Sequence, residues 1–322
     1  MPFRLLFLPP ITEIHRGWAR RLAAEVAGLE VRVAETPAEA DAGLAEADGA
    51  VGTLDAARLS RANNLCWLQS HQAAPPAGYY FPELVAHRLV VTNMREIYND
   101  HIGAHVMAFV LAFARGFHEY LPQQLRAEWK PRPLDQGVVD LPSSTMLVVG
   151  LGGIGAELAR LAKAFGMTVL ATDARRTGRP PSVDELHPAD RLDALLPRAD
   201  FVVLTVPHTP ATEGFMHRAR FRLMRKSAFF INIGRGMTTR LDGLVDALRA
   251  GDLAGAALDV FETEPLPADH PLWRMGNVLI TPHTAGYGPH LDERRYAIIR
   301  DNCRAVIAGT QLRNVVDKAA WF

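Results

Sequence analysis

The sequence predicts an α/β protein built from two doubly wound parallel sheets. Short apolar strands alternate with amphipathic stretches of helical spacing along most of the chain. A glycine-rich turn near the middle, at residues 149–155, joins a buried strand to a helix. Alternating strands and helices form parallel sheets that are covered on both faces. The chain has 322 residues, 48% of them hydrophobic, which is enough for two domains with a core each.

The first hundred residues supply the elements of one such sheet. Apolar residues at helical spacing indicate a helix over 13–27, and an Ala/Glu/Asp-rich stretch at 34–48 favours a second helix. The candidate strands around these helices are Arg4–Leu8, Val31–Ala34, Gly49–Val51, Leu65–Leu68 and Leu89–Thr92.

A long, nearly all-apolar helix is predicted over 101–117, and a loop rich in prolines and charges over 118–144. Because apolar residues surround much of this helix, we expect it to be buried on several sides. It fits a crossing helix between two domains or a helix at a subunit interface.

The second sheet is expected between about 145 and 285. A final helix over about 290–308 then returns to the first sheet, where the tail Leu312–Val316 is again strand-like. The predicted domains are therefore 1–98 with 290–322, and 99–289. The six strands predicted for the second sheet are Met146–Val149, Thr168–Thr172, Phe201–Leu204, Ala228–Asn232, Gly255–Asp259 and Val278–Ile280.

Composition argues against several classes of partner. Basic and acidic residues balance at 35 each, so we expect no nucleic-acid or membrane-surface partner. The apolar run Val106–Ala114 is far shorter than a membrane span, and the apolar start of the chain is too short for a secretory signal. Cys66 and Cys303 have no metal-ligand spacing, so we predict no metal and a reducing, cytoplasmic location.

The glycine-rich turn has the order that a dinucleotide needs. Gly150 permits a tight turn, Gly152 lets the backbone approach a pyrophosphate, and Gly155 lets the following helix pack close to the sheet. Asp173 ends the next strand about 20 residues further on, where a carboxylate can bind a ribose hydroxyl. These residues predict a Rossmann dinucleotide-binding domain; a structural turn that binds nothing is the alternative.

Three charged side chains follow successive strands of this domain. Arg235 lies between two glycines, and a guanidinium there suits a carboxylate. Glu264 follows the strand that ends at Asp259, and His283 follows the last strand. The ends of these strands are where open α/β sheets bind ligands. Hydride transfer to a 2-keto acid needs a cation for the carboxylate and a proton donor for the oxygen, and it benefits from an acid that holds the imidazole.

In their order and context, these motifs resemble those of the D-isomer-specific 2-hydroxyacid dehydrogenase family, in particular its glyoxylate/hydroxypyruvate reductases. The resemblance covers most of the chain and is dense from about 145 to 290. It implies a homodimeric enzyme with a Rossmann domain inserted in a flavodoxin-like substrate domain. It also implies hydride transfer between NAD(P)H and a small 2-keto acid or D-2-hydroxy acid. The motifs are Gly150-Leu-Gly-Gly-Ile-Gly155, Asn232-Ile-Gly-Arg235-Gly, Asp259-Val-Phe-Glu-Thr-Glu264-Pro and Thr281-Pro-His283-Thr-Ala-Gly.

The resemblance also implies a role for each matching position. Arg235 would bind the substrate carboxylate, His283 would be the acid and base, and Glu264 would hydrogen-bond His283. The expected cofactor contacts are Gly150, Gly152, Gly153, Ile154, Gly155, Asp173, Val206, Pro207, Thr212, Ile233, Gly234, Arg235, Asp259, His283, Ala285 and Gly286.

The expected substrate loop departs from the family pattern. The family holds the substrate carboxylate with N–H groups of a glycine-containing loop, whereas this chain has Pro75 and Pro76, which carry no N–H. The carboxylate contacts must then come from neighbours, which include Ser70, His71, Gln72, Ala73 and Ala74.

The cofactor form and two other functions remain open. Asp173 favours NAD because a carboxylate repels a 2′-phosphate, whereas Arg175 and Arg176 could neutralise that phosphate and favour NADP. The alternative functions are an NAD(H)-binding, corepressor-like sensor and a dehydrogenase of another oxyanion substrate on the same fold.

Overall fold

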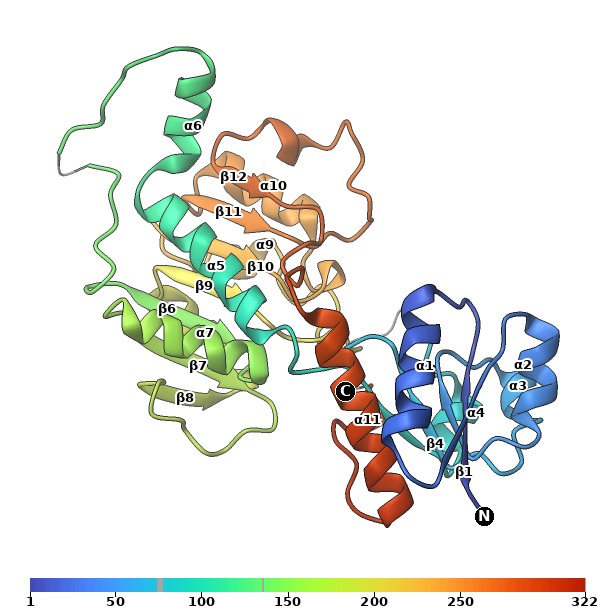
Figure 1. The fold of residues 1–322 in the computed structure, drawn as a ribbon. Coiled ribbons are helices and arrows are strands. Elements are labelled where there is room, and N and C mark those ends of the chain that lie inside the picture. Colours follow the sequence, from blue (N-terminus) through green and yellow to red (C-terminus); the bar gives the residue numbers. More distant parts are fainter. Residues whose placement is uncertain (74–77, 135, 322) are drawn as a thin grey trace. The chain divides into compact units, whose positions relative to one another are not determined.

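The structure is a computed structural model that describes residues 1–73, 78–134 and 136–321 (Figure 1). The chain divides into two compact units. Unit 1 contains both chain ends, Met1–Ile97 and Pro289–Phe322, and unit 2 is the continuous stretch Tyr98–Gly288.

Unit 1 is built on a five-stranded parallel sheet of order β2-β1-β3-β4-β5, the flavodoxin-like order. All five strands expected here are present, with bounds shifted by two residues or fewer. The strands are β1 (Phe3–Phe7), β2 (Leu29–Val33), β3 (Gly49–Val51), β4 (Trp67–Gln69) and β5 (Val90–Thr92). The helices are α1 (Glu13–Glu25), α2 (Pro37–Leu44), α3 (Ala56–Leu59), α4 (Pro82–Ala86) and α11 (Leu291–Ala308).

Unit 2 is built on a seven-stranded parallel sheet of order β12-β11-β10-β9-β6-β7-β8, which is the Rossmann order extended by one strand. The fold class predicted from the sequence is thereby confirmed. The strands are β6 (Thr145–Val149), β7 (Thr168–Asp173), β8 (Glu185–Pro188), β9 (Phe201–Leu204), β10 (Phe229–Asn232), β11 (Gly255–Leu258) and β12 (Val278–Ile280).

The helices of unit 2 cover both faces of this sheet. In Figure 1, α5 and α7 lie side by side on one face, and α9 and α10 belong to the other. Successive strand residues alternate between the two cores, as the pairs Leu147/Val148, Val202/Val203 and Phe230/Ile231 show. The helices are α5 (Asn99–Ala114), α6 (Phe117–Leu125), α7 (Gly153–Ala164), α8 (Leu192–Leu195), α9 (Arg218–Phe221) and α10 (Leu241–Ala250), with short 3-10 turns at Ala189–Arg191, Leu196–Arg198, Gly236–Thr238 and Pro271–Arg274.

Three of the expected secondary-structure assignments were wrong. The sheet of unit 2 has a seventh strand, β8, which was missed because its sequence Glu-Leu-His-Pro is half-exposed and pairs only with β7. Part of the expected loop 118–144 forms α6, despite Pro122 inside it. The tail 312–316 makes a single bridge from Val315 to Thr92 instead of a strand, because Asn314 takes a left-handed φ of 57°.

The apolar helix α5 is covered within its own unit. Most of its apolar side chains, from Ile102 to Phe113, lie in the core that it shares with α7 and the sheet. The breadth of its apolar surface is therefore explained by packing inside unit 2. Further along the chain, several apolar side chains on α6 and just beyond it are exposed.

Candidate active site

The predicted motifs lie at one edge of the seven-stranded sheet. All strands of this sheet are parallel, so the segments that follow their carboxyl ends emerge at the same edge. The segments at this edge are Gly150–Gly155 after β6, Asp173–Arg176 at the end of β7, Thr205–Thr212 after β9, Ile233–Gly236 after β10, Asp259–Glu264 after β11 and Thr281–Gly286 after β12.

The glycine turn has the geometry that its sequence predicts. Gly150 has a left-handed φ of 98°, and a Cβ atom on Gly155 would lie 2.1 Å from the Gly150 carbonyl oxygen. Gly152 is the N-cap of α7, and a Cβ atom there would meet nothing within 4 Å. The first turn of α7 therefore presents bare backbone N–H groups and the positive end of the helix dipole, which suit a pyrophosphate.

The Asp173 carboxylate organises the turn beside it. Its oxygens accept the backbone N–H groups of Leu151, Arg175 and Arg176 at 2.7, 2.8 and 2.7 Å. Burial raises the pKa of Asp173, but the three N–H groups outweigh burial and hold this pKa below its usual value. The side chain is therefore a negative charge at the expected position, with three of its acceptor positions already used.

Two expected cofactor contacts, Val206 and Thr212, shape the loop after β9. The Thr212 hydroxyl donates to the Pro207 carbonyl at 2.7 Å and accepts the Thr209 N–H at 2.8 Å. A Cβ atom on Gly234 would lie 2.5 Å from the Val206 carbonyl oxygen, so the loops after β9 and β10 touch. Thr212 thus fixes the loop, and the glycine at 234 permits its close approach.

The turn that carries Arg235 is held by Asn232, a residue for which no role was predicted. This fully buried amide accepts the Gly234 N–H at 3.0 Å and donates to the Arg235 carbonyl at 3.2 Å and the Thr239 hydroxyl at 3.0 Å. The detectable signal was a polar amide at the end of an otherwise apolar strand. A Cβ atom on Gly236 would lie 1.9 Å from the Phe261 backbone, so only glycine fits there.

Arg235 is a half-buried cation next to an acid. Its guanidinium donates to the Gly234 carbonyl at 2.7 Å. Burial lowers the pKa of Arg235, and the charge of Glu264 opposes that effect. A guanidinium remains protonated even so, which leaves a positive charge at the edge of the sheet where the glycine turn lies.

Glu264 and His283 form a hydrogen-bonded pair. Nδ1 of His283 lies 2.7 Å from Oε2 of Glu264, and Oε1 of Glu264 accepts the Phe261 N–H at 3.0 Å. Their side chains are 47% and 36% exposed, so this hydrogen bond contributes about 1 kcal/mol or less to stability. The main effect of the bond is to orient the imidazole and to leave Nε2 for another partner.

The buried Asp259 carboxylate gathers the segment around His283. It accepts the Thr281 hydroxyl at 2.5 Å, the Thr284 N–H at 2.8 Å and the Ala285 N–H at 2.9 Å. The His283 N–H donates to the Asp259 carbonyl at 2.8 Å. Asp259, expected as a cofactor contact, therefore positions the residues that carry the imidazole.

The expected substrate loop belongs to unit 1, and its residues 74–77, with both prolines and Ala74, lie outside the described residues. Ser70 is buried, and its hydroxyl donates to the Gln72 carbonyl at 3.3 Å and accepts the Gln72 N–H at 3.2 Å. Asn93 donates to the Ala73 carbonyl at 2.8 Å. Burial against His15 lowers the pKa of His71 to about 4, so His71 is neutral at physiological pH and supplies no cation for a carboxylate.

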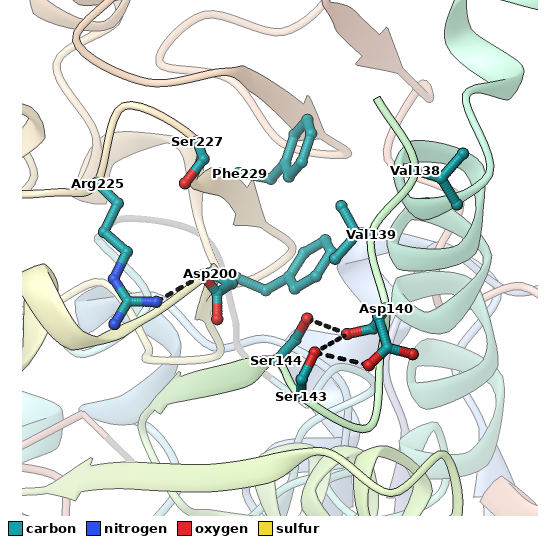
Figure 2. A pocket seen from close by; sticks show the side chains of 10 residues that line it. Val138, Val139, Asp140, Ser143, Ser144, Asp200, Arg225, Ser227 and Phe229 are labelled. Atoms are coloured by element: carbon teal, nitrogen blue, oxygen red, sulfur yellow. Dashed lines mark hydrogen bonds and ion pairs between the residues drawn. The ribbon is translucent and has the colours of Figure 1, made fainter. Parts of the chain in front are cut away.

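A separate pocket of about 300 Å³ lies at the opposite, amino-terminal edge of the sheet (Figure 2). Its charged groups have hydrogen-bond partners in the pocket lining: Arg225 donates to Asp200 at 2.7 Å, and Ser143 donates to Asp140 at 2.6 Å. Asp200 also accepts the Thr145 N–H at 2.8 Å. These groups stabilise the starts of the strands, and the predicted motifs all lie at the other edge.

The described residues contain neither a cluster of metal ligands nor a helix that could span a membrane. Within residues 1–73, 78–134 and 136–321, no three His, Cys, Asp or Glu side chains are grouped as metal ligands would be. Over the same part of the chain, no helix combines the length and the apolar character that a membrane span requires.

Known proteins with a similar sequence or structure also bind NAD(P). A family model for the NAD binding domain of D-isomer specific 2-hydroxyacid dehydrogenases matches residues 107–285. The chain is 34% identical to glyoxylate/hydroxypyruvate reductase B of Klebsiella pneumoniae, over 88% of both chains. A D-isomer specific 2-hydroxyacid dehydrogenase of Xanthobacter autotrophicus, crystallised with NADPH and MES, has a TM-score of 0.84 at 28% identity over 100% of both chains. An NADPH-dependent glyoxylate/hydroxypyruvate reductase of Sinorhizobium meliloti, crystallised with NADP and sulfate, has a TM-score of 0.82 at 27% identity, over 99% of this chain and 100% of its own.

The Rossmann sheet, the bare helix end and the Asp173 carboxylate define a dinucleotide-binding protein. The matched family model covers more than half of the chain, and the reductase of Klebsiella pneumoniae is similar over most of its length. The chain belongs to the D-isomer specific 2-hydroxyacid dehydrogenase family and is an NAD(P)-dependent 2-hydroxyacid dehydrogenase. The resemblance deduced from the sequence motifs is confirmed.

Proposed function

We propose that this enzyme reduces a small 2-keto acid to the D-2-hydroxy acid and that Arg235, Glu264 and His283 carry the chemistry. The observation that carries the proposal is the 2.7 Å bond between Glu264 and His283, at the same edge as the glycine turn and with Arg235 within reach of the Glu264 charge. The relatives named glyoxylate/hydroxypyruvate reductases support glyoxylate and hydroxypyruvate as substrates.

The geometry supports a distinct task for each side chain. The nicotinamide, when bound, supplies the hydride that adds to C2 of the keto acid. His283 gives the proton to the carbonyl oxygen from Nε2, because Nδ1 is held by Glu264. The Arg235 guanidinium binds the carboxylate through its planar fork and stabilises the negative charge that develops on the carbonyl oxygen. Asp259, Asn232 and the Thr212 loop hold these groups in place.

The direct test is oxidation of NADH and NADPH in the presence of glyoxylate, hydroxypyruvate, pyruvate and bulkier 2-keto acids. We expect glyoxylate or hydroxypyruvate to give the highest kcat/KM, more than about tenfold above a branched-chain keto acid. Tight cofactor binding without turnover of any keto acid would contradict the proposal and favour the corepressor-like sensor. Turnover limited to a substrate without a carboxylate would favour a dehydrogenase of another oxyanion.

We propose NAD as the preferred form of the cofactor. The ionised Asp173 carboxylate disfavours a 2′-phosphate, and it retains an acceptor position for a ribose hydroxyl. Arg175 and Arg176, both exposed beside it, favour NADP instead, and the similar enzymes of Xanthobacter autotrophicus and Sinorhizobium meliloti were crystallised with NADPH and NADP.

Titration calorimetry shows whether Asp173 or the two arginines decide the cofactor preference. We expect NADH to bind more than about tenfold more tightly than NADPH, because the Asp173 charge lies close to the ribose position. Arg176→Ala should weaken NADPH binding and leave NADH binding unchanged, and Arg191→Ala, at another exposed arginine of unit 2, should change neither. Tighter binding of NADPH to the wild-type enzyme would reverse the assignment.

We propose that the enzyme is a homodimer in the reducing cytoplasm. Its two cysteines are both free, which is consistent with that compartment. The exposed apolar side chains on and beyond α6 are the surface that a second copy would cover, because patches of this kind mark protein interfaces. They are Phe117, Leu121, Leu125 and Trp129, which are 53%, 55%, 89% and 95% exposed.

Light scattering after size-exclusion chromatography tests the dimer. At micromolar concentration we expect twice the 35.4 kDa mass of one chain. Leu121→Asp with Leu125→Asp should give the mass of one chain, because charges on this surface oppose its burial. Leu223→Asp, at an exposed leucine outside α6, should keep the dimer. A monomeric wild-type protein would contradict the proposal.

A further inference from the structure

A half-buried histidine for which no role was predicted contacts the segment that carries His283. His105 lies on α5, and its Nε2 atom is 3.0 Å from the Thr281 hydroxyl oxygen. Its ring stands edge-on to Phe109, with ring centroids 4.7 Å apart at 90°. The helix thus reaches the Thr281–Gly286 segment with a polar atom, although most of the side chains of α5 pack in an apolar core.

The proton count at Thr281 sets the direction of this hydrogen bond. The hydroxyl carries one proton and lies 2.5 Å from the Asp259 carboxylate, which as an anion can only accept. The hydroxyl must therefore accept from His105, and the Nε2 atom of His105 must carry the proton. Burial lowers the pKa of His105, while Asp259 at 4.0 Å opposes that effect. A neutral ring with its proton on Nε2 satisfies every member of this chain.

The backbone at His283 has a strained conformation that its neighbours must hold in place. His283 has a left-handed φ of 55°, a conformation that costs a non-glycine residue about 1 kcal/mol or more. Its own N–H donates to the Asp259 carbonyl, and the Asp259 carboxylate holds the residues on both sides of it. The position of the imidazole over Glu264 therefore depends on how firmly Asp259 and Thr281 are fixed.

We propose that His105 is a positioning residue for the reaction: its Nε2–H fixes the Thr281 hydroxyl on Asp259 and so holds His283 in the geometry that proton transfer needs. This inference rests on the proposed role of His283. It assigns α5 a second task besides packing, because the helix supplies the outermost donor of the chain His105–Thr281–Asp259.

The test variants remove the hydrogen-bonding groups of His105 and Thr281 and keep the approximate shape of each side chain. We expect His105→Phe and Thr281→Val each to lower kcat about tenfold, because a small displacement of the imidazole slows proton transfer, while NADH binds with a Kd within twofold of the wild-type value. The isotope effect on kcat with 4-deuterated NADH should rise as the chemical step becomes slower. His105→Gln and Thr281→Ser retain the hydrogen-bonding groups and should restore most of kcat. The double variant His105→Phe/Thr281→Val should be no slower than Thr281→Val alone, since both changes break the same chain.

Two further variants separate the possible outcomes. His187→Phe makes the same change at a half-exposed histidine of β8, which is bonded to Glu185, and should leave kcat unchanged. His283→Ala reports on the proposed function itself. If His283→Ala abolishes turnover while His105→Phe retains wild-type kcat, the positioning role is wrong and the proposed function stands. If His283→Ala retains activity, the proposed function fails. Equal loss of kcat in His105→Gln and His105→Phe would also overturn the inference.

Discussion

Replacing His283 with alanine is expected to lower kcat for keto-acid reduction about a thousandfold, because the proton donor to the carbonyl oxygen is lost. The Kd for NADH should change little, since the glycine turn and Asp173 are untouched. The imidazole is 47% exposed and its bond to Glu264 adds little to stability, so the variant should unfold at the wild-type temperature. Steady-state kinetics, fluorescence titration with NADH and thermal unfolding measure these three quantities.

Two companion variants sharpen this result. Arg235→Ala should also lower kcat strongly and leave NADH affinity nearly intact, whereas Arg235→Lys keeps the charge without the planar fork and should fall between. His217→Ala removes an exposed histidine of the same unit, and no effect is expected. Wild-type turnover in His283→Ala or in Arg235→Ala would eliminate the proposed mechanism.

The second large effect is expected at Gly155. A Cβ atom there would lie 2.1 Å from the Gly150 carbonyl oxygen. This oxygen belongs to the backbone, so it cannot rotate away as a side-chain atom could. Gly155→Ala must therefore push α7 away from β6, and we expect a loss of about 2 kcal/mol in the free energy of unfolding. The displaced helix end should also weaken NADH binding more than about tenfold. Urea unfolding and NADH titration measure the two losses.

Gly152 provides the matched control for the space argument. Its φ of −73° suits alanine, and a Cβ atom there would meet nothing within 4 Å. Gly152→Ala should therefore keep wild-type stability and still lose NADH affinity, because the methyl group occupies the approach of the pyrophosphate. If both variants kept wild-type NADH affinity, the turn would not be the pyrophosphate site. If Gly155→Ala kept wild-type stability, the close contact between α7 and β6 would be unimportant.

Most of the fold was predictable because its buried strands are short, apolar and bounded by turns. β3, at Gly49–Val51, was placed to the residue. Edge elements were not predictable in the same way. β8 is half-exposed and lacks an apolar signature, and α6 contains Pro122 and buries no residue. Their conformation depends on neighbours such as β7 that a local pattern does not reveal.

The residues of the site also differ in how well the sequence predicts them. Glycine spacing and charged residues after strands located the glycine turn, Asp173, Arg235 and His283, because each of these sits at a fixed position relative to a strand end. Two supporting residues were assigned no role, and only one of them acts through a contact between distant parts of the chain. Asn232 bonds residues within its own turn, but His105 contacts Thr281 across a separation of 176 residues. No local pattern in the sequence joins that pair.

The placement of both chain ends in unit 1 has a consequence for synthesis on the ribosome. Unit 2, Tyr98–Gly288, is complete before α11 emerges, whereas unit 1 still lacks the contacts that α11 makes with it, such as those of Tyr296 with Arg21 and of Asn302 with Gln69. In the nascent chain, unit 2 can therefore fold while unit 1 still exposes apolar surface. We therefore expect chaperones to bind the segment of unit 1 that is translated first, Met1–Ile97.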